Sequence, residues 1–178
     1  MSEKEIENSE IFAKNLKLNI LELAYYAGSS SSHFGGALSI VDIVSVIFSN
    51  HYVNDSKKKN QFILSKGHAC LAYYAALHQV GMIEKEELKT FEKDDSNLLG
   101  HPVINKDLGI DFSNGSLGMG LSIGLGIALA YKKKKSERKV FIILGDGECN
   151  EGSVWEAAMA GANLSLNNIY AIVDNNGF

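Results

Sequence analysis

The sequence has 178 residues, of which 46% are hydrophobic and 21% charged, and its formal net charge is −4. Length and composition predict an ordinary soluble globular protein with a core of its own. The slightly acidic charge gives no reason to expect a nucleic-acid partner. The most apolar run, residues 117–131, is too short to cross a bilayer. We therefore expect neither nucleic-acid binding nor a membrane anchor.

The two cysteines and the first residues indicate the compartment. Cys70 and Cys149 lie far apart and belong to no Cys-x-x-Cys or Cys/His cluster. This pattern is typical of free thiols in a reducing cytosol, not of a disulfide framework or a zinc site. Residues 1–10 are acidic and polar, unlike a signal peptide. We expect a cytoplasmic protein.

The first part of the chain is predicted to be mainly helical. Apolar residues that recur every three or four positions predict helices, and a short continuous apolar run predicts a strand. The predicted helices span residues 3–26, 39–48, 70–80 and 85–94, a polar loop covers 27–36, and a strand covers 61–64. The helix over 85–94 is expected to be charged and exposed.

The second part of the chain predicts a βαβ unit. Residues 139–144 and 169–173 are predicted to be buried parallel strands, with a helix over 151–163 between them and another over 117–135 before them. The alternation predicts an α/β fold, a parallel sheet with helices on both faces. We expect residues 1–178 to form a single domain.

Polar residues follow the two predicted strands of this unit. Asp146 comes after the first and Asn176 after the second, and parallel strands end on the same edge of a sheet. A carboxylate and an amide oxygen suit a hard cation such as Mg²⁺. Gly145 and Gly147 allow positive φ, and the backbone amides here favour anions. The alternative is an ordinary tight turn with an Asp cap and an Asx turn.

Three of the five histidines lie in glycine-containing loops, where side chains can face a ligand: His33, His68 and His101. His68 follows a strand, so we expect it on the same sheet edge as Asp146. Imidazole donates to phosphate or hydroxyl oxygens and exchanges protons near neutrality. Taken singly, each histidine is better explained as a solvated or turn-capping side chain, but three of them in such loops beside a phosphate-type site favour a ligand-facing role.

Several glycines and glutamates have structural explanations that need no ligand, namely close packing and helix capping. Among the glycines of residues 115–126 we expect Gly115 near a ligand, and Gly124 and Gly126 to serve tight helix packing. No G-x-G-x-x-G or Walker A register fits, which argues against nicotinamide and ATP. Glu148 and Glu156 are expected to cap the start of a helix.

Residues 145–152 and 174–177, Gly-Asp-Gly-Glu-Cys-Asn-Glu-Gly and Asp-Asn-Asn-Gly, resemble the thiamine diphosphate-binding motif, most closely that of transketolases. The resemblance implies that Asp146, Asn176 and the carbonyl of Phe178 hold Mg²⁺, for which Ca²⁺ or Mn²⁺ could substitute. Gly145 and Gly147 then contact the cofactor, whose diphosphate the metal holds.

Further motifs match the same family in order, at residues 32–36, 65–68, 100–102 and 115–120. By this resemblance His33 and His101 line the substrate channel and assist proton transfers, and His68 contacts the diphosphate. Gly115 and Leu117 match positions near the cofactor rings, and Glu151 matches a dimer-interface glutamate that couples two cofactor sites.

Two departures from the family pattern, Ser32 and Met119, leave the sugar specificity open. The family's activating glutamate belongs to a separate pyrimidine-binding domain, for which 178 residues hold no candidate. The chain therefore resembles the N-terminal subunit of a split transketolase that moves a two-carbon ketol unit between sugar phosphates. Its partner would be a pyrimidine-domain subunit, in a dimer of heterodimers. We expect the cofactor-binding domain to be truncated at its C-terminal end.

Three alternatives remain: the α-subunit of a 2-oxo acid dehydrogenase, a synthase of branched or modified sugars, and a non-catalytic partner subunit. The three histidine loops favour a transketolase over the dehydrogenase. The presence of both Asp146 and Asn176 argues against a degenerate subunit, in which such ligands would be lost first.

Overall fold

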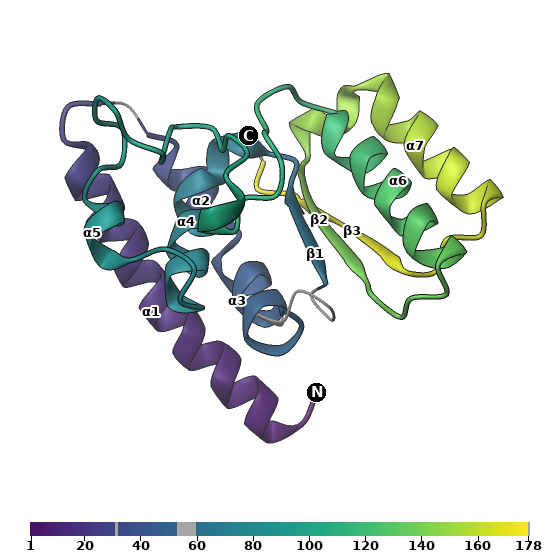
Figure 1. Cartoon of the computed structure of the whole chain (residues 1–178), viewed down its shortest axis with the longest axis horizontal. Helices are drawn as coiled ribbons and strands as arrows, with labels where there is room; N and C mark the ends of the chain where they lie inside the picture. Colours follow the sequence, from purple (N-terminus) through teal and green to yellow (C-terminus); the bar gives the residue numbers. More distant parts are fainter. Residues whose placement is uncertain (31, 53–59, 178) are drawn as a thin grey trace. The chain divides into compact units, whose positions relative to one another are not determined.

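The computed structural model describes residues 1–30, 32–52 and 60–177, and the chain falls into two compact units (Figure 1). The helical unit consists of Met1–His51 and Gly67–Ser113, and the sheet unit consists of Tyr52–Lys66 and Asn114–Phe178. A short stretch of the sheet unit therefore lies, in sequence, between the two segments of the helical unit.

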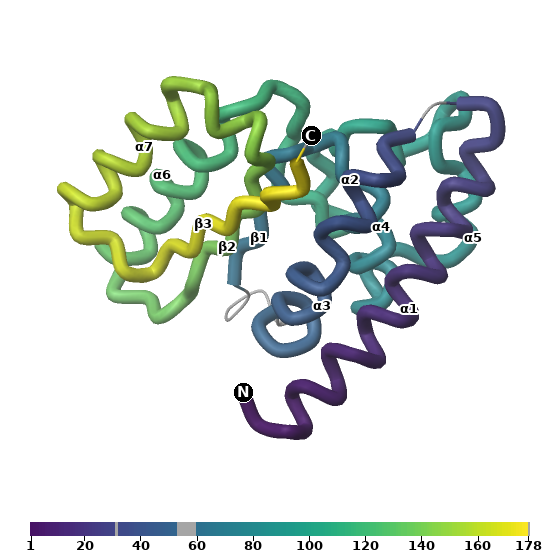
Figure 2. Tube along the Cα trace, turned by 180° about the vertical axis from the view of Figure 1, so that it is seen from behind, coloured from purple at the N-terminus to yellow at the C-terminus, as the bar shows by residue number. Residues whose placement is uncertain are grey.

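The helical unit is built around a long first helix. Its elements are α1 (Glu3–Ala27), α2 (Phe34–Ser39), α3 (Val41–Asn50), η1 (Gly67–Ala69), α4 (Cys70–Gln79), α5 (Lys85–Leu88) and η2 (Lys106–Leu108). Helix α1 packs against α3 and α4 (Figure 2), and its apolar face buries Leu16, Ile20 and Leu23 completely. Helix α4 is buried along most of its length, so it forms the centre of this unit.

A capping box starts α1. The Ser2 hydroxyl accepts from the Glu5 N–H at 3.3 Å, and the Glu5 carboxylate accepts from the Ser2 N–H at 2.7 Å. These hydrogen bonds from Ser2 hold the pKa of Glu5 below its usual value. The capping box satisfies amides that the first turn of a helix leaves unpaired.

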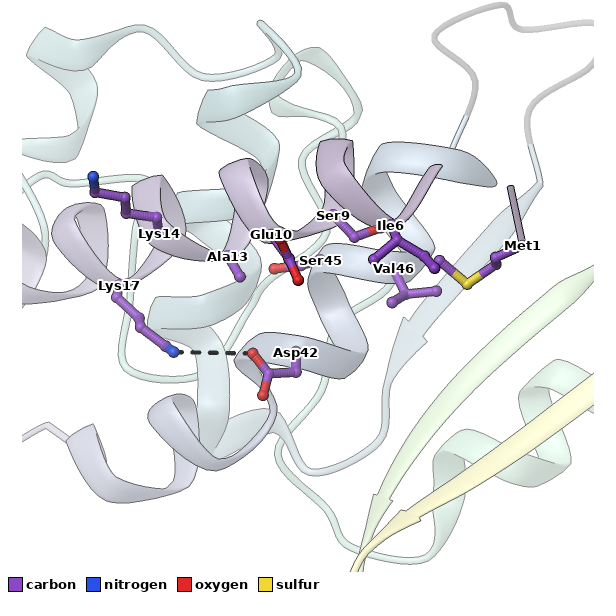
Figure 3. A pocket seen from close by; sticks show the side chains of 10 residues that line it. All are labelled: Met1, Ile6, Ser9, Glu10, Ala13, Lys14, Lys17, Asp42, Ser45 and Val46. Atoms are coloured by element: carbon purple, nitrogen blue, oxygen red, sulfur yellow. Dashed lines mark ion pairs between the residues drawn. The ribbon is translucent and has the colours of Figure 1, made fainter. Parts of the chain in front are cut away.

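A groove of about 510 Å³ opens between α1 and α3 (Figure 3). An ion pair between Lys17 and Asp42, at 3.9 Å, lies at one end, and Met1, Ile6 and Val46 gather at the other. The groove holds none of the residues that the sequence predicted to be functional.

The sheet unit contains three parallel strands in the order β1-β2-β3: β1 (Gln61–Leu64), β2 (Val140–Gly145) and β3 (Ile169–Asp174). Helices α6 (Met119–Lys133) and α7 (Gly152–Asn163) lie side by side on one face of the sheet (Figures 1 and 2). All three predicted strands and the parallel α/β arrangement are confirmed. The predicted burial of residues 169–173 is wrong, because Tyr170, Ala171 and Val173 are exposed and Ile169 and Ile172 are only half-buried.

Helix α6 approaches β2 closely through one glycine. A Cβ added at Gly124 would meet Ile142 of β2, whose Cγ1 would be 3.0 Å away, and Ile63 of β1 at 3.4 Å. The prediction that Gly124 serves packing is therefore confirmed. The same prediction for Gly126 is wrong, because Gly126 is exposed and a Cβ there would meet nothing within 4 Å.

Two local predictions in the helical unit are also wrong. Helix α5 ends at Leu88 and does not reach residue 94, because the following N–H groups, up to that of Phe91, donate to carbonyl oxygens three residues back and form turns. Farther along, the chain adopts positive φ at Glu92 (56°) and Asp95 (62°). Leu88 and Phe91 are fully buried, so this segment is not simply an exposed helix. The predicted loop over residues 27–36 gives way to α2 at Phe34.

None of the helices in the described part of the chain combines the length and the apolar character that crossing a membrane requires.

Candidate functional site

The carboxyl ends of the three strands meet at one edge of the sheet. The backbone N–H of Asp146, directly after β2, donates to the carbonyl oxygen of Asp174 at the end of β3, at 3.2 Å. The N–H of Gly177 donates back to Oδ2 of Asp146 at 3.3 Å. The loops after β2 and β3 are therefore tied together, and the Asp146 carboxylate faces the turn that carries Asn176.

A buried ion pair orients Asn176. Lys66, just after β1, pairs with Oδ2 of Asp174, and both side chains are almost fully buried. The same Oδ2 accepts a hydrogen bond from Nδ2 of Asn176 at 3.1 Å. Because the amide nitrogen faces Asp174, the amide oxygen of Asn176 is directed away from that carboxylate.

The donor set at this edge fits a hard cation. The Asp146 carboxylate and the Asn176 amide supply the oxygen ligands that Mg²⁺ takes in proteins, where phosphate and water complete its shell. The third predicted ligand, the carbonyl of Phe178, lies outside the described residues. Among the described residues no group of three His, Cys, Asp or Glu side chains is placed to hold a metal by itself.

Glu148 connects three segments of the sheet unit. It lies in η3 (Gly147–Asn150) and is 2% exposed, whereas the sequence predicted only a helix cap. Its Oε1 accepts from the Ser65 hydroxyl after β1 and from the Gly118 N–H at 2.8 Å, before α6. Its Oε2 accepts from the Gly145 N–H at 3.1 Å. A buried carboxylate thus fixes the ends of β1 and β2 and the start of α6.

The glycines beside Asp146 behave differently from the prediction. Neither Gly145 nor Gly147 has a positive φ. The Gly145 N–H is taken by Glu148, so this amide does not face a ligand. The exposed Gly147 begins η3 directly after Asp146. Close backbone packing falls instead on Gly118, whose φ is 80°. A Cβ on Gly118 would lie 2.7 Å from that of Glu151.

The remaining predicted residues of the sheet unit are exposed. Gly115 has a φ of 147°, and Leu117 is 42% exposed in the loop before α6. Glu151 occupies the N-cap position of α7, where its side chain makes no capping hydrogen bond. Glu156 lies beyond the first turn of α7, so the prediction that it caps the helix is wrong.

The three loop histidines come together in the helical unit. The ring centroid of His33 lies 5.3 Å from that of His68 and 6.1 Å from that of His101. His33 precedes α2 and His68 lies in η1, so two short helices position their rings. The sequence predicted that each faces a ligand, and the structure places all three in one cluster.

A cavity of about 180 Å³ adjoins this cluster. Its lining comprises Ser32, His33, Cys70, Leu71, Phe91, Glu92, Gly100 and His101. The Cys70 thiol donates to the carbonyl oxygen of Gly100 at 3.1 Å. Burial, and then the negative charge of Glu92, raises the pKa of Cys70 to about 12, so this thiol stays protonated at neutral pH.

Lys66, Glu148 and Glu92 are the residues that sequence reasoning missed. Lys66 and Glu148 closely follow apolar strand runs, which is the signal that could have shown that they are buried. The Asp174 partner of Lys66 lies 108 positions away, and the Ser65 and Gly118 partners of Glu148 lie 83 and 30 positions away, so local patterns do not show these contacts. The sequence pattern places Glu92 in an exposed helix, whereas in the structure Glu92 lies in a turn, has a positive φ and lines the cavity.

Comparison with known proteins identifies the family. The chain matches the family described as "Transketolase, thiamine diphosphate binding domain" over residues 15–178. It is 40% identical to a subunit of apulose-4-phosphate transketolase from Actinobacillus succinogenes, over 83% of this chain and 55% of that protein. It is 36% identical to human transketolase, over 92% of this chain and 27% of that protein. The chain thus spans about half the length of the bacterial relative.

Solved structures agree with the fold. The crystal structure of transketolase from Campylobacter jejuni superposes with a TM-score of 0.80 and 26% identity, covering 100% of this chain and 29% of that one. Transketolase from Leishmania mexicana superposes with a TM-score of 0.79 and 25% identity, covering 93% of this chain and 27% of that one. The fold, the motif at the sheet edge and these matches together show that the chain belongs to the transketolase family, as its thiamine diphosphate-binding domain.

Proposed function

We propose that this chain is the cofactor-binding part of a transketolase that transfers a two-carbon ketol unit from a ketose phosphate to an aldose. One observation carries the proposal: in a domain of this family, the Asp146 carboxylate faces the turn of Asn176 at the carboxyl edge of a parallel sheet. This is the edge at which open α/β sheets bind ligands.

In this proposal Asp146, Asn176 and the carbonyl of Phe178 hold a Mg²⁺ ion, which Ca²⁺ or Mn²⁺ could replace, against the diphosphate. Thiamine diphosphate, when bound, supplies the carbon nucleophile that accepts the two-carbon unit. The Lys66–Asp174 pair holds the Asn176 amide in one orientation. Glu148 keeps the strand ends and the start of α6 in register. The contribution of these residues is a preorganised site.

The histidine cluster is proposed to manage protons. Imidazole exchanges protons near neutrality and can both donate to and accept from a sugar hydroxyl. We assign His33 and His101 to proton transfer at substrate hydroxyls, and His68 to the cofactor diphosphate. Gly115, Leu117 and Gly147 are assigned to the cofactor, and Glu151 to communication between two sites. The assignments rest on the family motifs and on the clustering of the three rings.

We further propose that a second polypeptide completes the active site. Two relatives are named as subunits of apulose-4-phosphate transketolase, and the chain covers 55% and 62% of their lengths. A third is named as a subunit of 6-deoxy-6-sulfo-D-fructose transketolase. These names support a separate partner subunit and a ketose substrate that carries an unusual substituent. We propose that the partner carries the pyrimidine-binding domain and that the two chains form a dimer of heterodimers in the cytoplasm.

Cofactor titration of the assembled complex tests the proposal. The protein is co-expressed with the product of the neighbouring open reading frame as the candidate partner, and thiamine diphosphate is titrated by calorimetry with and without Mg²⁺. We expect saturable binding that requires the metal. Replacing Asp146 by Ala should weaken cofactor binding at least about 100-fold, since it removes the only charged group among the three proposed ligands.

Glu137→Gln is the matched control, because Glu137 is a carboxylate of the same unit that lies outside the proposed site. It should bind the cofactor as the wild type does. The absence of saturable binding in the wild-type complex would refute the proposed function. Unchanged binding in Asp146→Ala would refute the metal assignment alone. Turnover with xylulose 5-phosphate and a panel of aldoses then defines the substrates.

A further inference from the structure

One acidic side chain reaches the histidine cavity from a strained turn. Glu92 follows the buried Phe91, whose ring packs edge-on against Tyr74 with centroids 6.0 Å apart. Its φ is 56°, a conformation that side chains larger than glycine rarely adopt. Its N–H donates to the carbonyl oxygen of Leu98 at 3.0 Å, which closes the turn. Strain of this kind persists where the surroundings impose it, and it concentrates at binding sites.

The carboxylate of Glu92 lies against the segment that carries His101. A Cβ at Gly100 would collide with Oε1 of Glu92, and the carboxyl carbon would be 3.4 Å away. Glycine at position 100 therefore makes room for the carboxylate beside His101. The same negative charge contributes to the raised pKa values of Cys70 and Tyr74, after the larger effect of burial.

The lining of the cavity lacks a fixed positive charge. Its described residues offer the Ser32 hydroxyl, two imidazoles and the Glu92 carboxylate, and they include neither lysine nor arginine. Fixed cations, arginine above all, are what proteins place against a phosphate or sulfonate. A carboxylate repels such groups, whereas it accepts strong hydrogen bonds from hydroxyls.

We propose that Glu92 is a specificity-determining residue, which accepts hydrogen bonds from substrate hydroxyls in the His33–His101 cavity and keeps anionic substituents out of it. The proposal rests on the proposed function for the identity of the substrate as a sugar. The cavity then takes the uncharged, hydroxylated portion of the sugar, and the phosphate or other anionic end binds elsewhere.

Direct binding to the full-length chain tests this inference without turnover. The imidazole resonances of His33 and His101 are followed by NMR while erythritol or meso-tartrate is added. Meso-tartrate has the same four-carbon chain with a carboxylate at both ends, so either end brings a negative charge into the cavity. We expect erythritol to shift these resonances at lower concentration than meso-tartrate. Glu92→Gln, which removes the charge and keeps an acceptor, should shift the ratio of the two dissociation constants about tenfold in favour of meso-tartrate.

Two variants serve as controls. Asp94→Asn removes an equal charge from an exposed position of the same turn and should leave the ratio within about twofold. Glu92→Asp retains the charge and should retain the preference for the neutral probe. Backbone amide spectra establish that each variant is folded, and Glu92→Met replaces Glu92→Gln if the latter is not.

An unchanged ratio in the charge-neutral variant overturns the proposal. So does the absence of any saturable shift with erythritol in the wild type, or tighter binding of meso-tartrate than of erythritol. Because this readout needs neither cofactor nor partner, its failure is separate from a failure of cofactor binding, which would contradict the proposed function instead.

Discussion

Glu148 is the residue on which the sheet edge depends most directly. Both of its oxygens accept hydrogen bonds inside the sheet unit, from the Ser65 hydroxyl and from the amides of Gly118 and Gly145. Hydrogen bonds to a buried charged group are stronger than those between neutral groups, and leaving a donor unpaired costs its desolvation. Glu148 thus contributes to stability through the same contacts that shape the site.

Replacing Glu148 by Gln is expected to destabilise the protein by about 2–4 kcal/mol. The Gln side chain keeps one acceptor but turns an NH₂ group toward at least one N–H or O–H donor. Urea unfolding, followed by circular dichroism, measures the loss. Glu156→Gln, at an exposed position of α7, should stay within about 0.5 kcal/mol of the wild type. Equal stabilities for the two variants would contradict the role assigned to Glu148.

Cys70 predicts a dependence of stability on pH. Its thiol has a pKa of about 12 in the folded protein, against 9.0 for an unperturbed thiol, so above pH 9 the unfolded chain loses a proton that the folded chain keeps. Stability from this group is complete below pH 9 and is lost as the pH rises toward 12, by up to about 1.4 kcal/mol per pH unit.

The expected result is a fall in the urea midpoint between pH 8 and pH 10 that is steeper for the wild type than for Cys70→Ala. Groups other than Cys70 titrate in both proteins, so the difference between the two slopes isolates the thiol. Parallel slopes would show that Cys70 ionises equally in the folded and unfolded chains.

At the scale of elements, the contact between α6 and β2 predicts opposite effects on stability for alanine substitutions at two glycines of α6, Gly124 and Gly126. Gly124→Ala gains helix propensity of about 1 kcal/mol, but its methyl group would collide with Ile142, and overpacking costs about 1–3 kcal/mol. We expect a net loss of up to about 2 kcal/mol. Gly126→Ala, with open space around it, should stabilise the protein by up to about 1 kcal/mol.

Thermal and urea unfolding of the two variants provide the measurement, and their opposite signs provide the control. If both substitutions stabilise the protein, the α6–β2 interface has room for a methyl group and the close packing at Gly124 is refuted.

The strands were predictable because each is a short run of apolar residues. In β2 this run reflects burial along the whole strand, whereas β3 has the same apolar pattern although most of its residues are exposed or half-buried. Helix α5 was not, because Leu88 and Phe91 fit a helical period while the chain actually turns at Glu92. Local periodicity records which residues are buried, and it does not record which tertiary contacts end a helix.

At the scale of the whole molecule, some residues of the candidate site can be predicted from the sequence, whereas the long-range contacts that hold them in place cannot. Asp146 and Asn176 follow predicted strands, so the parallel topology alone brings their loops to one edge. The Lys66–Asp174 pair links residues 108 positions apart, and its existence depends on how β1 joins the sheet. Such contacts are fixed by tertiary packing and leave no periodic signal in the chain.

The pairing of β1 with β2 has a consequence for biosynthesis. Gln61 pairs with Val140, so a ribosome translates about 80 residues after β1 before its partner strand begins. Translation proceeds at about 5–20 residues per second, so roughly 4 to 16 s pass before β2 is synthesised. During this time the backbone of the apolar run Phe62–Ile63–Leu64 has no partner strand. An unpaired apolar edge is a site for wrong pairing between nascent chains. Ribosome-associated chaperones that recognise short apolar segments are therefore expected to bind this protein during translation, at β1.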